Sequence, residues 1–343
     1  MSTSSTLTKT IKCFSADGPK KSLKPFQYES PSVGPHDILI EISHCGICHS
    51  DLHLINNDWN ITQYPLVPGH EIIGIIKQKG ERADGLEVGQ RVGVGWQRSS
   101  CGHCEWCRQG EQKFCFKAEN TCVGHYGGFA EYIVADSRFA FPIPDQLASE
   151  DAAPLLCGGA TVFAPLLSHK VKATSRVGVI GIGGLGHFAL QFAHALGCEV
   201  VAFSSSPDKE KEAKEFGADH FISSTDPKAI QKAVSSIDFL LCSSSEHMNW
   251  EVFLSTLRPK GNLCLVGAPK EGQINAKILN LILGSKSISG SNISNPQMIR
   301  DMLQFAAHHN IVAKTEVFAM SEVNTALNKL ASNQIHYRGV LKN

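Results

Sequence analysis

The stretch Arg176–Phe188, R-V-G-V-I-G-I-G-G-L-G-H-F, joins a short apolar run to the glycine pattern G-x-G-x-x-G at residues 181–186. The apolar run predicts a buried strand, and the residues from Gly184 to Leu196 predict a helix with one apolar face. Glycines between a strand and a helix permit a tight turn and let backbone N–H groups approach a pyrophosphate at the positive helix end. Glycine-rich turns also occur in proteins that bind no dinucleotide. The sequence pattern on either side of the turn therefore decides whether a dinucleotide site is predicted.

Strand and helix patterns alternate after this turn. Strands are predicted at residues 199–203, 221–223, 239–241 and 263–266, and a charged helix at 208–216. This alternation predicts a doubly wound parallel sheet, entered near residue 150 and left near residue 290. In that context the glycine turn favours a dinucleotide site.

The first part of the chain carries a different pattern. Short strands are predicted at Asp37–His44, His70–Gln78 and Arg91–Val94, with glycines between them. From Pro296 onwards the chain is expected to return to this β-rich region. The fold class is therefore α/β, with residues 1–150 and 296–343 in a β-rich domain and residues 151–295 in a nucleotide-binding domain.

Composition excludes several classes of partner. Among 343 residues, Lys+Arg and Asp+Glu both number 32, so the chain has no positive surplus for nucleic acid or anionic lipid. The Ser/Thr-rich start, Met1–Lys12, has no apolar segment typical of a signal peptide, and no uninterrupted apolar run reaches about 20 residues. We expect a cytoplasmic protein without nucleic-acid or membrane partners.

Cysteine and histidine residues form two ligand sets of different character. Four cysteines spaced C-x2-C-x2-C-x7-C can close a tetrahedron around one zinc ion; they are Cys101, Cys104, Cys107 and Cys115. Cys48, His70 and Cys157 would supply two sulfurs and one imidazole, which leaves a fourth position open for chemistry. Spacing alone does not separate Cys48 from Cys45 in C-G-I-C-H. The remaining cysteines are expected to be buried free thiols: Cys13, Cys45, Cys122, Cys198, Cys242 and Cys264.

The end of the strand at Phe203 bears on the choice of dinucleotide. An NAD-selective domain carries an acidic residue there, whereas this chain has Ser204, Ser205 and Ser206, followed by Lys209. Hydroxyls and a cation favour a 2′-phosphate, so we predict NADP. The alternative is that the serines only cap the helix that begins near Pro207.

Together these motifs resemble those of zinc-dependent medium-chain alcohol dehydrogenases, and more narrowly their cinnamyl-alcohol-dehydrogenase-like branch. The resemblance covers nearly the whole chain and rests on C-G-I-C-H-S-D-L-H (45–53), N-D-W-N (57–60), Y-P-L-V-P-G-H-E (64–71), the four-cysteine segment, the glycine turn and S-S-S. It implies a GroES-like catalytic domain with a Rossmann domain, two zinc ions per chain, NADP(H), and interconversion of primary alcohols and aldehydes. It also implies a homodimer joined edge to edge by a strand at Ser287–Ile293.

The resemblance also assigns roles to residues. Cys48, rather than Cys45, becomes the ligand, Glu71 an alternate ligand, and Asp51 the hydrogen-bond partner of His70. Ser50 and His53, three residues apart and on one face of a predicted helical turn, form a proton relay to the surface. His49 falls at a pyrophosphate contact or the pocket rim, while Trp59 and Trp96 line the cleft or belong to the core.

Cofactor contacts are predicted over both parts of the chain. They are Ser50, Thr161, Gly181, Ile182, Gly183, Gly184, Leu185, Gly186, Ser204, Ser205, Ser206, Lys209, Ser243, Gly267, Ser291, Asn292 and Ile293. Three other functions compete with an aldehyde reductase: a zinc-dependent secondary-alcohol or polyol dehydrogenase, a structural or nucleotide-sensing zinc protein, and a zinc-ribbon nucleic-acid module. The neutral charge opposes the last of these.

Overall fold

A computed structural model describes residues 9–244, 248–268 and 272–343, and the chain divides into two compact units. The first unit is Met1–Cys157 with Ser294–Asn343, and the second is Gly158–Ile293. The chain thus leaves the first unit once and returns to it. The functional division at residues 150 and 296 stays a prediction.

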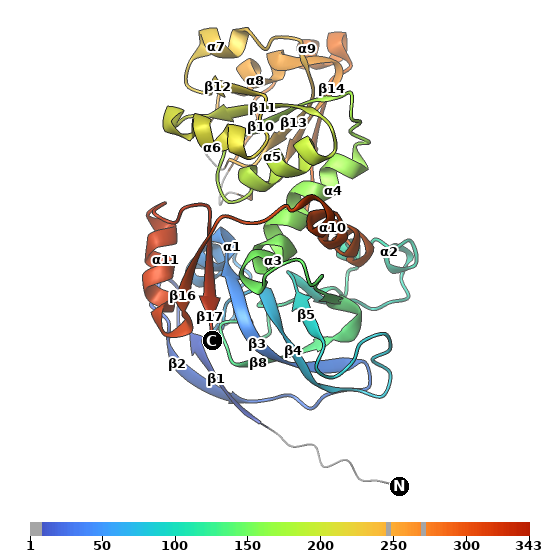
Figure 1. Ribbon diagram of the computed structural model, residues 1–343, viewed down its shortest axis with the longest axis vertical. Coiled ribbons are helices and arrows are strands. Elements are labelled where there is room, and N and C mark those ends of the chain that lie inside the picture. The colour runs from blue at the N-terminus through green and yellow to red at the C-terminus, as the bar shows by residue number, and fades with distance from the viewer. Residues whose placement is uncertain (1–8, 245–247, 269–271) are drawn as a thin grey trace. The chain divides into compact units, whose positions relative to one another are not determined.

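The first unit is built on a seven-stranded sheet in the order β16-β17-β3-β4-β5-β9, with β8 paired to β3 (Figure 1). Its strands are β3 (Asp37–Ile47), β4 (Glu71–Lys79), β5 (Arg91–Val94), β8 (Tyr132–Asp136), β9 (Ala140–Pro142), β16 (Thr315–Ala319) and β17 (Arg338–Lys342). Alternate residues of β3 are buried in its first half, as expected for a strand with one face on the core. The predicted strands of this region are present, and β3 continues past His44 to Ile47.

Smaller elements surround this sheet. They are β1 (Thr10–Ser15), β2 (Lys24–Glu29), α1 (His49–Asn56), β6 (Gln97–Ser99), α2 (Glu105–Arg108), β7 (Glu119–Asn120), α3 (Ser149–Pro154), α10 (Pro296–His309) and α11 (Val323–Ala331). Helix α1 starts directly after β3, and the Asp51 carboxylate accepts the backbone N–H of Cys48 at 2.9 Å, which fixes the first turn. Cys48 and α1 together carry five residues of the predicted site: Cys48, His49, Ser50, Asp51 and His53.

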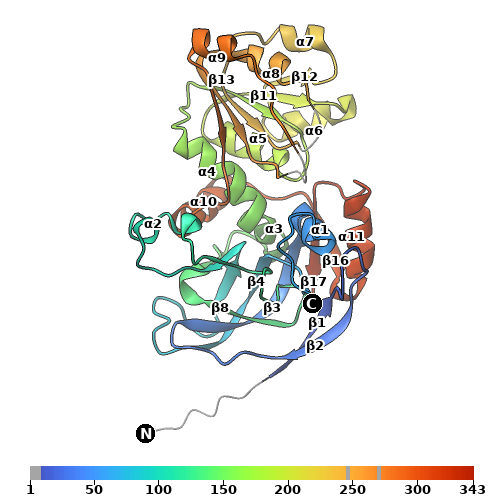
Figure 2. The same ribbon diagram turned by 180° about the vertical axis from the view of Figure 1, so that it is seen from behind.

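The second unit is a six-stranded parallel sheet in the order β12-β11-β10-β13-β14-β15, which is the 3-2-1-4-5-6 order of a dinucleotide-binding fold. Its strands are β10 (Arg176–Ile180), β11 (Glu199–Ser204), β12 (His220–Ser223), β13 (Ile237–Cys242), β14 (Leu257–Leu265) and β15 (Ser287–Gly290). Its helices are α4 (Ala160–Ser168), α5 (Gly186–Ala195), α6 (Glu210–Glu215), α7 (Pro227–Gln231), α8 (Trp250–Thr256) and α9 (Ile278–Gly284). Figures 1 and 2 show helices on both sides of this sheet. The predicted doubly wound fold is confirmed.

Two predicted elements differ in detail. The helix expected at residues 208–216 consists of a 3₁₀ turn, Pro207–Lys209, followed by the shorter α6. The strand expected to reach Ile293 ends at Gly290, where the backbone leaves the ladder with β14.

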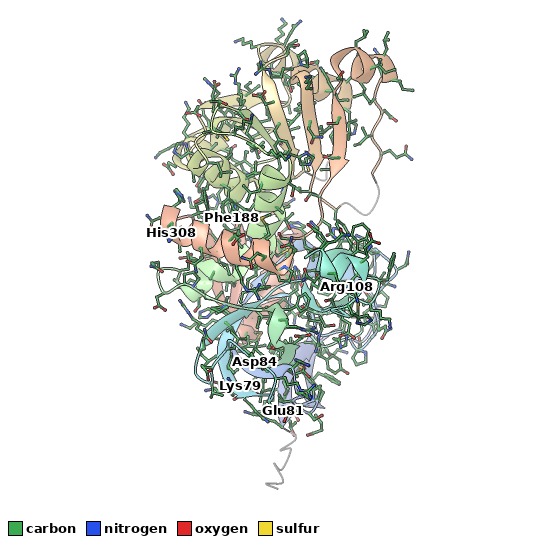
Figure 3. All side chains as sticks on the ribbon, turned by 90° about the vertical axis from the view of Figure 1, so that its right-hand side faces the viewer. Lys79, Glu81, Asp84, Arg108, Phe188 and His308 are labelled. Carbon is green, nitrogen blue, oxygen red and sulfur yellow. The ribbon has the colours of Figure 1, made fainter. Side chains whose placement is uncertain are left out.

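One helical stretch of 20 residues, Ser149–Ser168, is apolar enough to cross a membrane by length and composition. Of its most apolar window, 83% is buried inside the protein, which is typical of a core helix. Charged residues of both signs stand together elsewhere on the surface. An example is Lys79, at the end of β4, with Glu81 and Asp84 in the segment that follows (Figure 3). This mixture agrees with the absence of net charge.

Candidate active site

Four donor atoms, from Cys48, His70, Glu71 and Cys157, lie within 4.8 Å of one another in the first unit. Cys48 is the N-cap residue of α1. Glu71 is the first residue of β4, and His70 immediately precedes it. Cys157 lies in a π-helical turn, Leu155–Gly159, after α3. His70 Nε2 is 3.4 Å from Cys157 Sγ. Two ligands of a tetrahedral zinc site, one sulfur and one nitrogen, are about 3.6 Å apart at ordinary bond lengths. The spacing therefore fits a shared zinc ion.

Electrostatics inside this cluster also favour a cation. The Cys157 thiol donates to Cys48, which lowers the pKa of Cys48 well below its ordinary value and raises that of Cys157. Burial lowers the pKa of His70, but the Asp51 carboxylate and the Cys157 sulfur outweigh it, and the net change is upward. Zinc binds cysteine as the thiolate and histidine as the neutral imidazole. A metal that binds here must therefore displace the protons held by the Cys157 thiol and the His70 imidazole.

Asp51 holds the histidine from its other side. Its Oδ1 is 3.2 Å from His70 Nδ1 and also accepts the backbone N–H of Gly69 at 3.0 Å. Both Asp51 and His70 are fully buried. A carboxylate on Nδ1 leaves Nε2 to face the thiols, which is the arrangement that orients a zinc-binding imidazole. The hydrogen bond predicted for Asp51 is present.

Glu71 has one oxygen paired and one unpaired. Arg338 Nη2, from β17, donates to Glu71 Oε1, and both side chains are buried. Glu71 Oε2 is buried and has no hydrogen-bond partner among the described residues. Burial raises the pKa of Glu71 to about 7, although Arg338 opposes the shift. A buried acceptor without a partner is costly, and a cation in the cluster would supply one.

Of the two residues predicted to relay a proton, Ser50 contacts a ligand and His53 contacts Asp58. The Cys48 thiol donates to Ser50 Oγ at 3.6 Å. His53 Nδ1 lies 2.8 Å from Asp58 Oδ2, an interaction that orients the imidazole. Both residues of this pair are partly exposed, so the pair can exchange a proton with solvent.

Two indole rings cover the same region. Trp96 meets the His70 ring edge-on at 5.0 Å, and Trp59 lies 5.0 Å from the ring of His53. Trp59 and Trp96 contact each other at 6.2 Å. Both are only partly buried, so they belong to the site's surroundings as well as to the core.

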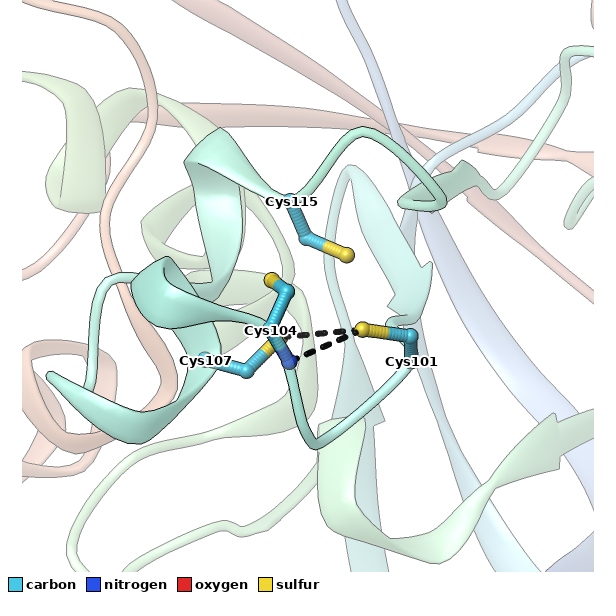
Figure 4. Close-up of side chains that lie close together, drawn as sticks. All are labelled: Cys101, Cys104, Cys107 and Cys115. Atoms are coloured by element: carbon cyan, nitrogen blue, oxygen red, sulfur yellow. Dashed lines mark hydrogen bonds between the residues drawn. The ribbon is translucent and has the colours of Figure 1, made fainter.

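The four cysteines with the spacing of a closed zinc site form the second cluster. Cys101, Cys104, Cys107 and Cys115 have their sulfurs within 4.8 Å of one another, and Figure 4 shows the side chains converging. The 3.9 Å between Cys101 Sγ and Cys107 Sγ matches the roughly 3.8 Å edge of a zinc–thiolate tetrahedron. The backbone N–H of His103 is foremost among the groups that lower the pKa of Cys101, to about 6. The set fits a closed zinc site.

The glycine turn of the second unit has open space where a ligand is expected. Gly181 adopts φ +86°, and a Cβ on Gly186 would lie 1.9 Å from the Gly181 carbonyl oxygen, so both positions require glycine. A Cβ on Gly183 would meet nothing within 4 Å. The protein itself therefore does not demand glycine there, whereas a pyrophosphate approaching the backbone would. Ser243 supports the turn by donating to the carbonyl of Gly181 at 2.8 Å.

Side-chain capping, the alternative to phosphate binding for the serines at the end of β11, is not seen at the 3₁₀ turn that follows. Ser206 is the N-cap residue of the 3₁₀ turn, yet its side chain makes no cap hydrogen bond. Ser204 is buried, and its hydroxyl accepts the N–H of Ser206 at 3.2 Å. Ser205 is exposed and Ser206 partly so. Lys209 Nζ donates to the carbonyl of Ile182 at 2.8 Å, which brings a cation to the glycine turn.

The other predicted cofactor residues occupy the second unit. Thr161 is buried in α4, Gly267 follows β14, and Ser291 donates its N–H to the Leu265 carbonyl at 2.9 Å. Asn292 is exposed and its Oδ1 accepts the N–H of Ile293 at 2.8 Å.

The sequence alone gave no functional role to three residues around the cluster of Cys48, His70, Glu71 and Cys157. They are Arg338, Asp58 and Cys122. Arg338 is 267 positions from its partner Glu71, and no local pattern links them. Asp58 belongs to the quoted N-D-W-N motif, but only folding reveals its pairing with His53. Cys122 was expected to be a buried thiol and is buried, yet it lies beside His70 and Asp51.

Comparisons with known proteins agree over the whole chain. Residues 34–145 match the alcohol dehydrogenase GroES-like domain family, and residues 184–308 match the zinc-binding dehydrogenase family. The aldehyde reductase AdhA of Synechocystis sp. is 41% identical, over 96% of this chain and 98% of its own length.

Solved structures give the same result. A cinnamyl alcohol dehydrogenase of Sorghum bicolor superposes with a TM-score of 0.93 at 34% identity, covering 97% of this chain and 98% of its own. A cinnamyl alcohol dehydrogenase of Helicobacter pylori complexed with NADP(H) reaches a TM-score of 0.90 at 32% identity, covering 98% and 99%. The chain therefore belongs to the zinc-binding alcohol dehydrogenase family with a GroES-like domain, in the branch of the cinnamyl alcohol dehydrogenases and aldehyde reductases.

Proposed function

We propose that this enzyme is a zinc-dependent, NADP(H)-dependent alcohol dehydrogenase that interconverts primary alcohols and aldehydes. Membership of the family supports alcohol and aldehyde chemistry, and the relative in Synechocystis is named an aldehyde reductase. The observation that carries the proposal is the convergence of Cys48, His70, Glu71 and Cys157 donors within 4.8 Å, with Glu71 Oε2 still without a partner among the described residues.

Each residue of the site has a part in this reaction. Cys48, His70 and Cys157 would hold the metal, and Glu71 would be available as a fourth ligand when substrate is absent. When bound, a zinc ion supplies Lewis acidity toward an alcohol or aldehyde oxygen, and NADP(H) donates or accepts the hydride.

The proton needs a separate path from the hydride. During aldehyde reduction the Ser50 hydroxyl gives a proton to the substrate oxygen, and His53 replaces it from solvent. Asp58, 2.8 Å from His53 Nδ1, keeps the imidazole oriented for this transfer. Trp59 and Trp96 limit the access of water to the same region.

NADP rather than NAD is the proposed dinucleotide. The chain has no acidic residue at the end of β11, Ser205 and Ser206 offer accessible hydroxyls, and Lys209 brings a cation to the glycine turn. A related cinnamyl alcohol dehydrogenase was solved with NADP(H). We propose that residues 1–150 and 296–343, together with Cys157, carry the metal chemistry and that the rest of residues 151–295 bind the cofactor.

Two further features belong to the proposal. We expect a homodimer, because β15 ends the sheet of the second unit and can pair with a second copy of itself. We expect a cytoplasmic enzyme, because all twelve cysteines are free and two sets of them need to stay reduced to bind metal.

A panel of primary and secondary substrates with NADPH and NADH tests the proposal, alongside metal analysis after purification without chelators. We expect two zinc ions per chain and faster turnover of primary aldehydes with NADPH. Preferential turnover of ketones would favour the secondary-alcohol or polyol alternative, and a folded protein with both zinc ions but no turnover would favour a structural or nucleotide-sensing role.

A further inference from the structure

We propose that Cys122 is a positioning residue for the zinc-binding histidine, holding the His70 imidazole together with Asp51. This inference rests on the proposed zinc site formed by Cys48, His70 and Cys157. It gives a role to a thiol that lies outside both ligand sets.

The position of the thiol is the first argument. Donor atoms of Cys122, His70 and Asp51 lie within 4.8 Å of one another, and Cys122 is 1% exposed. The Cys122 thiol therefore lies beside the buried His70 imidazole. Cys122 is thus a second polar neighbour of the ring, on a side chain that solvent does not reach.

The hydrogen bond that Asp51 makes explains why a second neighbour matters. At 3.2 Å, the contact between His70 Nδ1 and Asp51 Oδ1 is at the long end of the usual range, and Oδ1 is shared with the Gly69 N–H. A shared, long hydrogen bond leaves a ring freer to tilt than a short one does. A thiol packed against the ring restricts that tilt, and Nε2 then stays directed at Cys157, 3.4 Å away.

The backbone around Cys122 is fixed by its neighbours. Thr121 donates its N–H to the Trp96 carbonyl at 2.8 Å and its hydroxyl to the same oxygen at 3.1 Å. The strands β6 and β7, which carry Gln97 and Asn120, pair just beside these bonds. Trp96 also contacts the His70 ring. The pairing of β6 with β7 therefore places two side chains, Trp96 and Cys122, next to the imidazole.

Direct ligation by Cys122 is the less favoured geometry. His70 Nε2 already faces Cys157, and Cys48, Glu71 and Cys157 complete a set of four donors with it. Cys122 clusters instead with Asp51, whose carboxylate is occupied by the N–H groups of Gly69 and Cys48. The thiol therefore acts on the metal through the histidine.

Zinc affinity and a cobalt spectrum test this inference in the full-length enzyme. We expect Cys122→Ala to weaken zinc binding at the reacting site by about tenfold or more, in a chelator competition, because groups behind a metal-binding histidine have effects of that size. Cys122→Ser, which keeps a small polar group, should recover most of this loss. In the Co²⁺-substituted protein, Cys122→Ala should shift the visible ligand-field bands and leave the thiolate-to-cobalt charge-transfer intensity unchanged.

Cys264→Ala is the matched control, because it removes a similarly buried thiol from β14 in the second unit. An unchanged zinc affinity in Cys122→Ala, or a loss equal to that of Cys264→Ala, would overturn the inference. A Cys122→Ser variant as weak as Cys122→Ala would reduce the role to packing, and a drop in charge-transfer intensity would make Cys122 a ligand. A wild-type protein that binds no zinc outside the four-cysteine set would instead refute the proposed function.

Discussion

The carboxylates of Asp51 and Glu71 lie at the proposed zinc site and have different hydrogen-bond partners. These partners determine what each carboxylate can do. Asp51 accepts hydrogen bonds from Cys48, Gly69 and His70, so its capacity is used in holding the turn and the imidazole. Glu71 is paired to Arg338 through one oxygen, and its other oxygen has no partner among the described residues. Asp51 is thus fixed in place, whereas Glu71 is free to approach or leave a cation.

Cys48 and Cys45 give a direct test of the ligand assignment. We expect Cys48→Ser to abolish measurable turnover while one zinc per chain stays bound in the four-cysteine site, because serine is a poor substitute for a thiolate ligand. Cys45→Ala should keep two zinc ions, since Cys45 faces Gly69 and Gly128 rather than the donor cluster. Metal analysis and initial rates decide this, and a loss of one zinc from Cys45→Ala would contradict it.

His53 should act through proton transfer rather than binding. We expect His53→Gln to lower the rate of aldehyde reduction by about a hundredfold, within the usual range for removal of an acid–base group, and to leave the KM for NADPH nearly unchanged. Added imidazole should restore part of the rate in the variant and have little effect on the wild type. If imidazole gives no rescue and KM rises instead, His53 serves the structure near Trp59 and not the relay.

At the scale of elements, the end of the strand β11 carries the features on which the proposed preference for NADP(H) rests. Ser204 is the last residue of β11, and Lys209 reaches from the following 3₁₀ turn to Ile182. Each hydrogen bond to a charged group contributes about 1.5–3 kcal/mol. NADPH should therefore exceed NADH in kcat/KM by at least about tenfold.

Two substitutions separate the contributions to this preference. Ser204→Asp should move the preference towards NADH, because a carboxylate at the strand end binds the ribose hydroxyls and repels a 2′-phosphate. Lys209→Ala should raise the KM for NADPH and leave that for NADH nearly unchanged. Equal use of both cofactors by the wild-type enzyme would show that Ser205 and Ser206 do not bind phosphate.

Local patterns predicted the elements well and the long-range contacts of the site poorly. The run Arg176–Ile180 and its glycines specify a strand and turn through short-range sterics and hydrophobic periodicity, so β10 appears as predicted. The pairing of Glu71 with Arg338 joins β4 to β17 across 267 positions. The sequence around either residue contains no pattern that predicts this pairing. The apolar or mixed sequence context of Cys122 predicts only a buried free thiol, whereas its place beside His70 depends on how β6 and β7 pair.

At the scale of the whole molecule, the surface of α9 indicates self-association. Four large apolar side chains are more than 60% exposed on this helix of seven residues: Ile278, Leu279, Ile282 and Leu283. Helix α9 packs against β14 and is followed by β15, the last strand of its sheet. A strand edge beside an apolar helix face is costly to leave in water, and a second copy of the chain can cover both together.

This arrangement predicts that light scattering at micromolar concentration will give twice the 37.2 kDa mass of the chain. Ile282→Glu combined with Leu283→Glu should produce a monomer, because two charges would be buried without partners in the interface. Val234→Glu is the control, since Val234 is 45% exposed on the turn after α7 and lies outside the α9 surface. A monomeric wild type would refute the dimer, and a double variant that stays dimeric would place the interface elsewhere. A larger assembly that falls to a dimer in the double variant would show that α9 joins dimers to one another instead of forming them.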